Sequence, residues 1–273
     1  MKKEKIALQL YSVRGDLEKD FYGTIRAVKG IGYAGVEFAG LYGEDPVKVK
    51  AFCEELGIVP LSAHVPFQAF VADMDGTIAQ YKALGVQYVA IPYLTEDLRP
   101  GQPGFRTVID GMKVIGAKLK EAGIVQQYHN HDFEFVKLDG EYALDILYKE
   151  LGPELLQTQL DTCWVNVGGE NPADYIRKYA GRTPTVHLKD FLGEKSENMY
   201  GLIGLEGSEG KSGDVFQLRH LGSGKQDFPA IVKAADEGGA QWYIVEQDEP
   251  NKGMTPMECA KASYEYLINN IAE

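Results

Sequence analysis

The chain has 273 residues, of which 44% are hydrophobic and 25% are charged, a composition typical of globular proteins. A net charge of -12 would repel a phosphate backbone, which excludes nucleic acid as the main partner. No apolar run reaches transmembrane length, no signal peptide follows MKKEK, and the three cysteines lack a CxxC pair, so we expect a cytoplasmic protein with reduced thiols and no membrane partner.

Short apolar runs rich in Val, Ile, Tyr and Leu recur along the chain and predict β-strands. In chain order, the eight runs span Ile6–Val13, Gly35–Gly40, Val59–Val65, Tyr88–Tyr93, Val125–His131, Thr158–Trp164, Thr185–Asp190 and Trp242–Asp248. Amphipathic stretches between the runs predict helices, among them Leu17–Ile31, Asp45–Leu56 and Phe105–Ala122. A glycine stands before most of the following strands, where it can take the left-handed conformation that ends a helix. These glycines are Gly32, Gly57, Gly85, Gly123, Gly152, Gly181 and Gly239.

Two further pairs mark helix starts, because Asp45–Pro46 and Asn171–Pro172 each place a capping side chain before a first-turn proline. The strict alternation of strand and helix predicts a parallel sheet covered by helices. Eight such units predict an α/β fold, a (β/α)8 TIM barrel, in a single domain that spans residues 1–273. An open doubly wound sheet is the alternative, but no GxGxxG motif follows the first strand, where a dinucleotide-binding fold needs it.

One segment interrupts the alternation. The residues from Phe191 to Gln226 are rich in glycine, serine and charge, and they are too many for an ordinary turn between strand and helix. Because the segment follows the seventh strand, it would overhang the mouth of the barrel. We expect a lid or substrate loop that limits solvent access and contributes little to the stability of the fold.

Side chains that can bind metals stand where predicted strands end. They are His64, His129, His131, Asp161, His187 and Glu246. In a closed parallel barrel these ends converge on one face. Asp161, His187 and Glu246 end three successive strands, and this donor set without a thiolate suits Mn2+, Co2+, Zn2+ or Mg2+. A fourth ligand is expected from the fifth strand, where His129, His131 and Glu134 compete.

The motifs SAHVPF, YHNHDFEF, LDTCW, VHLKD, GSG followed by DF, and YIVEQ occur in this order along the chain. This ordered set resembles the xylose isomerase-like TIM barrels, over essentially the whole chain. That family contains sugar and sugar-phosphate isomerases and epimerases, inosose dehydratase and endonuclease IV. The resemblance implies one divalent cation held by Asp161, His187, Glu246 and the fifth-strand position, which falls on His129.

The fifth-strand position is also a departure from part of the family. Many of its sugar epimerases have a glutamate there, which serves with the eighth-strand glutamate as an acid–base pair, whereas this chain has His129. The nuclease branch is set aside, because Trp164 stands where that branch has a histidine and because the net charge disfavours DNA.

The resemblance implies chemistry next to the carbonyl of a small-molecule sugar or sugar derivative. Our first hypothesis is an isomerase or epimerase that transfers a proton through a metal-stabilised enediolate. The alternative is a lyase of the inosose-dehydratase or 3-keto-glycoside type, and a non-catalytic sugar-binding barrel is a third reading. A homo-oligomer is compatible with the sequence.

Further side chains are candidates for proton transfer and substrate binding. His131, Lys189 and Glu246 are the expected catalytic residues, and Lys189 faces the same side of its strand as His187. A surface or helix-capping lysine is an equally strong interpretation of Lys189. His64, Glu37 and Trp164 are the expected substrate-binding residues. Glu37 could instead pair with Arg14 as a buried structural charge.

Overall fold

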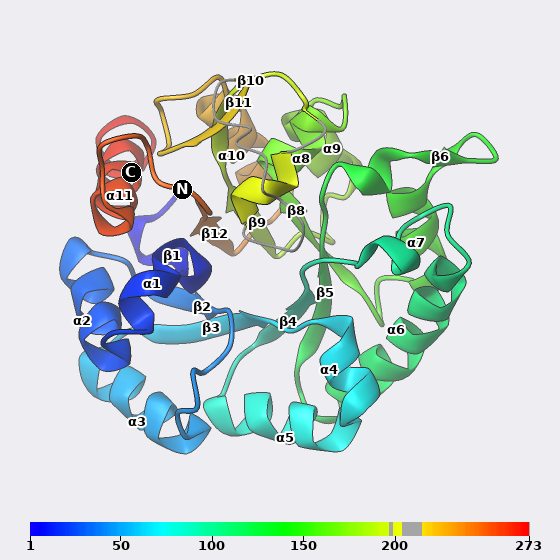
Figure 1. Cartoon of the computed structure of the whole chain (residues 1–273), viewed down its shortest axis with the longest axis horizontal. Helices are drawn as coiled ribbons and strands as arrows, with labels where there is room; N and C mark the ends of the chain where they lie inside the picture. The colour runs from blue at the N-terminus through cyan, green and yellow to red at the C-terminus, as the bar shows by residue number, and fades with distance from the viewer. Residues whose placement is uncertain (197–198, 204–214, 273) are drawn as a thin grey trace.

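The computed structural model describes residues 1–196, 199–203 and 215–272. Eight parallel strands close into a barrel, and helices surround it on the outside (Figure 1). In chain order the barrel strands are β1 (Ile6–Gln9), β2 (Gly35–Phe38), β3 (Val59–His64), β4 (Tyr88–Ile91), β5 (Val125–His129), β8 (Gln157–Asp161), β9 (Thr185–Leu188) and β12 (Trp242–Val245). Each strand pairs with its neighbours in this order, and β12 closes the barrel against β1. The predicted (β/α)8 TIM barrel is confirmed. Each barrel strand stops before the end of the apolar run that predicted it.

The helices of the outer layer follow the predicted signals. They are α1 (Arg14–Leu17), α2 (Phe21–Ile31), α3 (Pro46–Leu56), α4 (Phe67–Ala72), α5 (Met74–Leu84), α6 (Gly104–Glu121), α7 (Ala143–Leu151), α8 (Thr162–Val167), α9 (Pro172–Lys178), α10 (Phe228–Glu237) and α11 (Pro256–Asn270). Asp45 and Asn171 accept backbone hydrogen bonds in the first turns of α3 and α9, as predicted. All seven predicted helix-ending glycines have a positive φ. The predicted helix Leu17–Ile31 is divided, because Asp20 caps α2 through the backbone N–H of Gly23.

The inside of the barrel changes from apolar to polar along its axis. Near the amino ends of the strands an apolar cluster fills it, made of Ala7, Leu61, Tyr88, Trp242 and Ile244. Toward the carboxyl ends the buried side chains are polar: Gln9, Glu37, Ser62, Gln127, Gln159 and Thr185. These side chains hydrogen-bond one another. The barrel therefore offers a polar floor beneath its carboxyl face, whereas the main hydrophobic core lies between strands and helices.

The segment expected to act as a lid forms ordered structure at its described ends. Strands β10 (Asp190–Gly193) and β11 (Phe216–Arg219) pair as an antiparallel hairpin, and the short helix η5 (Met199–Ile203) lies between them in the chain. Alternate side chains of β11 are buried. The hairpin packs on the start of α8 in a small hydrophobic cluster of Cys163, Trp164, Phe191, Met199, Phe216 and Leu218. The expectation that the segment contributes little to the fold is wrong for these ends, and its central part, 204–214, lies outside the described residues.

Several short elements complete the described chain. They are the 3-10 helices η1 (Lys3–Lys5), η2 (Leu10–Val13), η3 (Glu96–Leu98) and η4 (Phe133–Phe135), and the strands β6 (Lys137–Leu138) and β7 (Glu141–Tyr142). The three cysteines are buried, and none forms a disulfide. Within the described ranges, no helix combines the length and the apolar character that crossing a membrane requires.

Candidate metal and catalytic site

Four buried side chains meet at the carboxyl ends of β5, β8, β9 and β12. They are His129, Asp161, His187 and Glu246, the predicted metal ligands. Each of the four residues offers one potential ligand atom, and these four atoms all lie within 4.8 Å of one another. His129 Nε2 lies 3.8 Å from Asp161 Oδ2 and 3.9 Å from Glu246 Oε2, which is too far for hydrogen bonds. The structure therefore brings the predicted set together with room between its donor atoms.

This donor set fits a divalent cation. Asp161 Oδ2 and His129 Nδ1 are buried and have no hydrogen-bond partner among the described residues. A buried polar atom without a partner is costly, and a cation beside the carboxylate would remove that cost for Asp161. Two imidazoles and two carboxylates without a thiolate are typical donors for Mn2+, Co2+ or Zn2+, and the carboxylates also suit Mg2+.

His64 belongs to a second group of donors that is also close enough to hold a cation, together with His129 and His187. Its Nε2 atom is already engaged, since it lies 2.8 Å from Gln159 Oε1 and 2.9 Å from Glu37 Oε1. Its ring stacks on the His187 ring with centroids 5.2 Å apart. We therefore assign His64 to the wall of the site and the cation to the set that contains both carboxylates.

Glu37 is the centre of the polar network beneath the cluster. Its carboxylate lies 2.8 Å from His187 Nε2, while His187 Nδ1 lies 2.9 Å from Glu246 Oε2. Gln9, Ser62 and Gln159 donate further hydrogen bonds to the same carboxylate. A carboxylate on the second nitrogen of a metal-binding histidine fixes the orientation of its ring. Glu37 is thus placed to hold His187 with Nδ1 directed at the cluster.

Glu37 and His187 each stabilise the charged form of the other. Burial would raise the pKa of Glu37, but the His64 and His187 rings outweigh burial and hold the pKa well below its usual range. Burial would lower the pKa of His187, but Glu37 and Glu246 outweigh it and raise the pKa to about 10. The expected ion pair between Glu37 and Arg14 is wrong, because Arg14 Nη1 donates to the backbone oxygens of Tyr11 and Asp248.

Lys189 is buried inside the site, so the interpretation as a surface or helix-capping lysine is wrong. Its Nζ lies 2.6 Å from Asp248 Oδ2, 3.2 Å from Glu246 Oε2 and 3.7 Å from Asp161 Oδ2. Burial would lower its pKa, but Asp248 and Glu246 outweigh burial and hold the pKa well above its ordinary value. Asp248 is not among the predicted site residues, although strand alternation places it on the same side as Glu246.

His131 is buried next to the cluster but is not part of it. Its ring is parallel to the Phe133 ring at 5.4 Å, and its Nδ1 has no hydrogen-bond partner among the described residues. Burial and then the charge of Lys189 hold the pKa of His131 well below its usual range, so the ring is neutral. Glu134 is not a ligand, because its carboxylate accepts the backbone N–H of His131 at 2.8 Å and the hydroxyl of Tyr128. Burial raises the pKa of Glu134 to about 8.

A cavity of about 970 Å³ opens onto the cluster. Five of the predicted site residues line it: His64, His129, His131, Lys189 and Glu246. Glu37 and Trp164 do not line it. Glu37 is fully buried beneath His64 and His187, and Trp164 is fully buried behind His131 and Lys189. The structure therefore does not place the predicted substrate-binding residues Glu37 and Trp164 in the cavity wall. Glu37 extends from β2 into the polar network beneath His187, and Trp164 packs from α8 against the β10–β11 hairpin.

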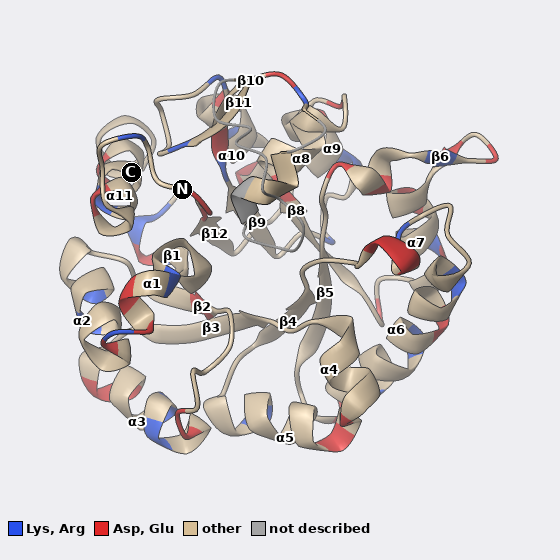
Figure 2. Ribbon diagram, in the orientation of Figure 1, with Lys and Arg blue, Asp and Glu red and all other residues tan. Residues whose placement is uncertain are grey.

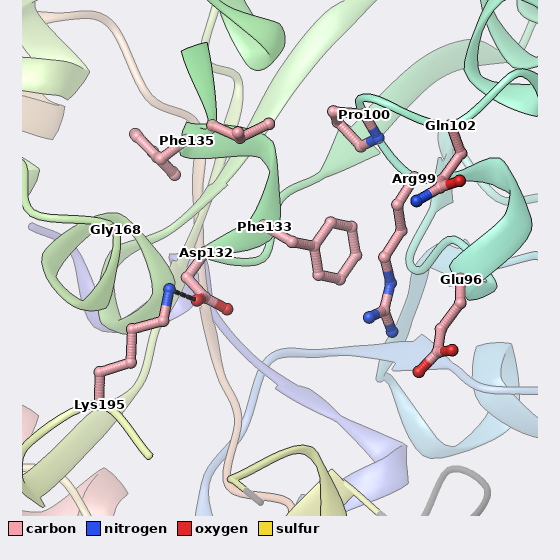
Figure 3. Close-up of a pocket in the computed structure, with 10 residues that line it drawn as sticks. Glu96, Arg99, Pro100, Gln102, Asp132, Phe133, Phe135, Gly168 and Lys195 are labelled. Carbon is pink, nitrogen blue, oxygen red and sulfur yellow. Dashed lines mark ion pairs between the residues drawn. The ribbon is translucent and has the colours of Figure 1, made fainter. Parts of the chain in front are cut away.

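A smaller cavity, of about 520 Å³, lies beside the larger one and shares Glu96 with it. In Figure 3 the Phe133 ring stands at its centre, with Arg99 on one side and the ion pair between Lys195 and Asp132 on the other. The Arg99 guanidinium lies 4.4 Å from the centroid of the Phe133 ring. No sequence pattern predicts this cavity, since its lining residues come from segments that are distant in the chain.

The family model described as xylose isomerase-like TIM barrel matches residues 25–269. Over 170 residues the chain is 30% identical to the inosose dehydratase of Clostridium beijerinckii, covering 60% of this chain and 53% of that protein. It is 24% identical over 273 residues to the inosose dehydratase of Lacticaseibacillus casei, covering 92% of this chain and 89% of that protein. The chain thus matches about half the length of the first relative and most of the second.

Solved structures show the same fold at lower sequence identity. A sugar phosphate isomerase/epimerase from Parabacteroides distasonis superposes with a TM-score of 0.79 and 23% identity, covering 99% of this chain and 96% of that chain. An L-ribulose 3-epimerase superposes with a TM-score of 0.71 and 16% identity, covering 98% of this chain and 94% of that chain. These likenesses concern the fold alone.

Proposed function

Because the chain belongs to the xylose isomerase-like TIM barrel family, we propose that it is a divalent-metal-dependent lyase acting on a keto sugar or keto-polyol. The reaction is the removal of a proton next to the carbonyl and the loss of a hydroxyl or alkoxyl group from the following carbon. One observation carries this proposal: the imidazole of His131 and the ammonium of Lys189 both contact the Trp164 ring and both line the cavity at the cluster.

This arrangement suits elimination better than epimerisation. Epimerisation needs proton-handling groups on opposite faces of the reacting carbon, whereas elimination needs one base and one group that assists the departing oxygen. The fifth-strand donor is His129, so the paired glutamates that many epimerases use are absent from the four-residue cluster. Both curated relatives described above are inosose dehydratases, which supports the same choice.

The four donors and the cavity residues have separate tasks. A divalent cation held by His129, Asp161, His187 and Glu246 would polarise the carbonyl oxygen of the substrate. His131 accepts the proton from the neighbouring carbon, because burial keeps its ring neutral and no hydrogen bond to a described residue engages its Nδ1.

Lys189 assists the departing oxygen. Asp248 and Glu246 hold the pKa of Lys189 well above its ordinary value, so Lys189 stays charged and stabilises the developing negative charge by a hydrogen bond. The departing oxygen takes up the proton that His131 has accepted, so that water or the alcohol is released and His131 is neutral again. The cavity of about 970 Å³ lies at the upper end of the volumes that bind drug-sized ligands, so it accommodates an alkoxyl leaving group as well as water.

The test is NMR analysis of products in D2O, with metal-loaded protein and a panel of inososes, ketoses and 3-keto-glycosides. We expect loss of water or of the alcohol, together with an unsaturated product. Incorporation of deuterium without loss of either would identify the isomerase or epimerase considered from the sequence instead. Binding without any exchange or elimination would identify a non-catalytic sugar-binding barrel.

A further inference from the structure

We infer that the cavity is built for an uncharged substrate and that it excludes sugar phosphates. This inference rests on one part of the proposed function, namely that the cavity at the metal cluster binds the substrate. It is independent of whether the reaction is an elimination. Three features of the described residues support the inference. The cavity lining is acidic, the nearby cationic side chains already have partners, and a carboxylate already binds the backbone N–H groups of a glycine-rich loop.

The lining of the cavity is acidic. Glu96 and Asp97 lie at its mouth, Glu246 and Asp248 lie at its base, and Lys189 is the single lysine or arginine among its described lining residues. Four carboxylates and one ammonium leave the lining with three negative charges, which a divalent cation would reduce but not cancel. Figure 2 shows that most lysines and arginines lie instead on the outer helices and loops. A phosphoryl group would meet carboxylates of like charge at Glu96 and Asp97 and again at Glu246 and Asp248.

The cations near the cavity are already engaged. Lys189 lies 2.6 Å from Asp248 and 3.2 Å from Glu246. Arg14 lies over the Tyr11 ring at 4.3 Å and donates to two backbone oxygens. Within the described ranges, Arg14 does not line the cavity, and two carboxylates already balance the charge of Lys189, so that Lys189 can donate a hydrogen bond to a substrate oxygen but offers no net positive charge to a phosphoryl group.

Two further cations belong to the smaller cavity (Figure 3). Arg99 is enclosed by the rings of Tyr93, Phe133 and Tyr200, with centroids 5.1, 4.4 and 5.1 Å away. Lys195 lies 2.6 Å from Asp132. Neither of the two lines the larger cavity.

The third feature is the loop Gly222–Gly224, which follows the β10–β11 hairpin. TIM barrels often bind phosphate through backbone N–H groups in the loops after the seventh and eighth strands. Here Asp190 Oδ2 accepts the N–H groups of Gly222 and Gly224, each at 2.9 Å. Asp190 Oδ1 accepts those of Phe191 at 2.9 Å and Gln226 at 3.2 Å.

The fit of Asp190 in this loop is close. A Cβ atom on Gly224 would lie 2.1 Å from Asp190 Oδ1, so the glycine is what admits the carboxylate. A side chain of the protein itself therefore takes up these backbone N–H groups, and no residue of the loop is among the described residues that line the larger cavity. The GSG motif, which sequence analysis noted without assigning a role, serves the fold and not an anionic ligand.

The first experiment compares matched ligands. The affinities of the metal-loaded protein for uncharged keto sugars and for their phosphate esters are measured by calorimetry at constant ionic strength. We expect each ester to bind about tenfold or more weakly than its parent, as like charge at short range requires. An ester that binds as tightly as its parent would overturn the inference. The double variant Glu96→Gln/Asp97→Asn, at the exposed mouth, should reduce the difference between parent and ester.

The second experiment needs no sugar. Inorganic phosphate should leave the melting temperature of the wild-type protein the same as in chloride of matched ionic strength. In Asp190→Ala the N–H groups of Gly222 and Gly224 lose their carboxylate partner, so phosphate should raise the melting temperature of this variant. Stabilisation of the wild type by phosphate would overturn the inference, and so would a folded Asp190→Ala that gains none. If Asp190→Ala does not fold, the calorimetric comparison decides alone. All these readouts are binding measurements, so they fail independently of the proposed elimination.

Discussion

Asp161 connects the metal cluster to the fold, because its two carboxylate oxygens have separate partners. Oδ1 accepts the backbone N–H of Trp164 at 3.0 Å and caps α8, whereas Oδ2 faces the cluster without a hydrogen bond to any described residue. We expect Asp161→Ala to lose the divalent cation, because the remaining donors cannot replace an anionic ligand. Metal content after gel filtration checks this.

Asp161→Asn separates the two tasks, since asparagine caps helices as well as aspartate does. It should keep the stability of α8 and still lose the cation. Asp174→Ala, at an exposed position on α9, is the control and should retain full metal content. Full occupancy in Asp161→Ala would show that the cation is held elsewhere.

His131 and Lys189 contact the cavity without belonging to the cluster, so metal binding and turnover should separate at these positions. We expect His131→Gln and Lys189→Met to keep the cation and to lower kcat by about two to four orders of magnitude, with smaller changes in KM. Steady-state kinetics together with metal analysis measure both properties. His220→Gln is the matched control, because His220 lies outside the site with its Nδ1 near a backbone oxygen. Wild-type kcat in either variant would remove that residue from the mechanism.

The raised pKa of His187 predicts that metal binding depends on pH. In the metal-free protein the pKa of about 10 means that the ring is protonated at neutral pH, and the proton competes with the cation for Nδ1. Rising pH removes the competitor, so the apparent affinity should increase by about tenfold per pH unit between about pH 7 and 9. Metal titration in buffers of different ionisation enthalpy should show about one proton released per cation. Affinity that does not change with pH would show that His187 is not a ligand.

At the scale of elements, the β10–β11 hairpin is part of the support of the site. Phe216 is fully buried and stacks on Trp164 at 5.8 Å and on Phe191 at 5.2 Å, so it connects the hairpin to the wall behind His131. We expect Phe216→Ala to lower the free energy of unfolding by about 3 to 5 kcal/mol, the usual cost of a buried phenylalanine.

Urea denaturation measures this loss. Val215→Ala is the control on the same hairpin, because Val215 is 55% exposed and should change the free energy of unfolding by less than about 0.5 kcal/mol. Equal effects at the two positions would mean that the hairpin does not depend on its packing against α8.

At the scale of the whole molecule, the cation should stabilise the entire barrel. Its four ligands come from β5 and from β8, β9 and β12, which lie side by side in the closed sheet, so unfolding any of them releases the ion. A ligand at about a thousand times its Kd adds about 4 kcal/mol to the free energy of unfolding. Calorimetric scans should therefore show a lower Tm after chelation, restored by added Mn2+, and no such change in Asp161→Asn. An unchanged Tm in the wild type would contradict the shared site.

The sequence by itself determined the architecture and most of the cluster. Strand and helix periods, the caps at Asp45 and Asn171 and the helix-ending glycines are local signals, so they can be read without tertiary contacts. The alternation of strands and helices then implies a closed barrel, whose geometry brings strand ends together. That is why Asp161, His187 and Glu246 could be predicted as neighbours although 85 residues separate the first from the last.

Only the tertiary structure decided how each side chain is used. Glu37 and His187 are 150 residues apart, and they meet inside the barrel although β2 and β9 are not paired, so that no local pattern records their contact. Whether His129 or Glu134 joins the metal cluster depends on the direction of the chain after β5, which turns the Glu134 carboxylate toward the backbone N–H of His131. The closure of the Gly222–Gly224 loop by Asp190 depends in the same way on the pairing of β10 with β11. The burial of these side chains and the charges around them result from long-range contacts, so they are set only when the barrel closes.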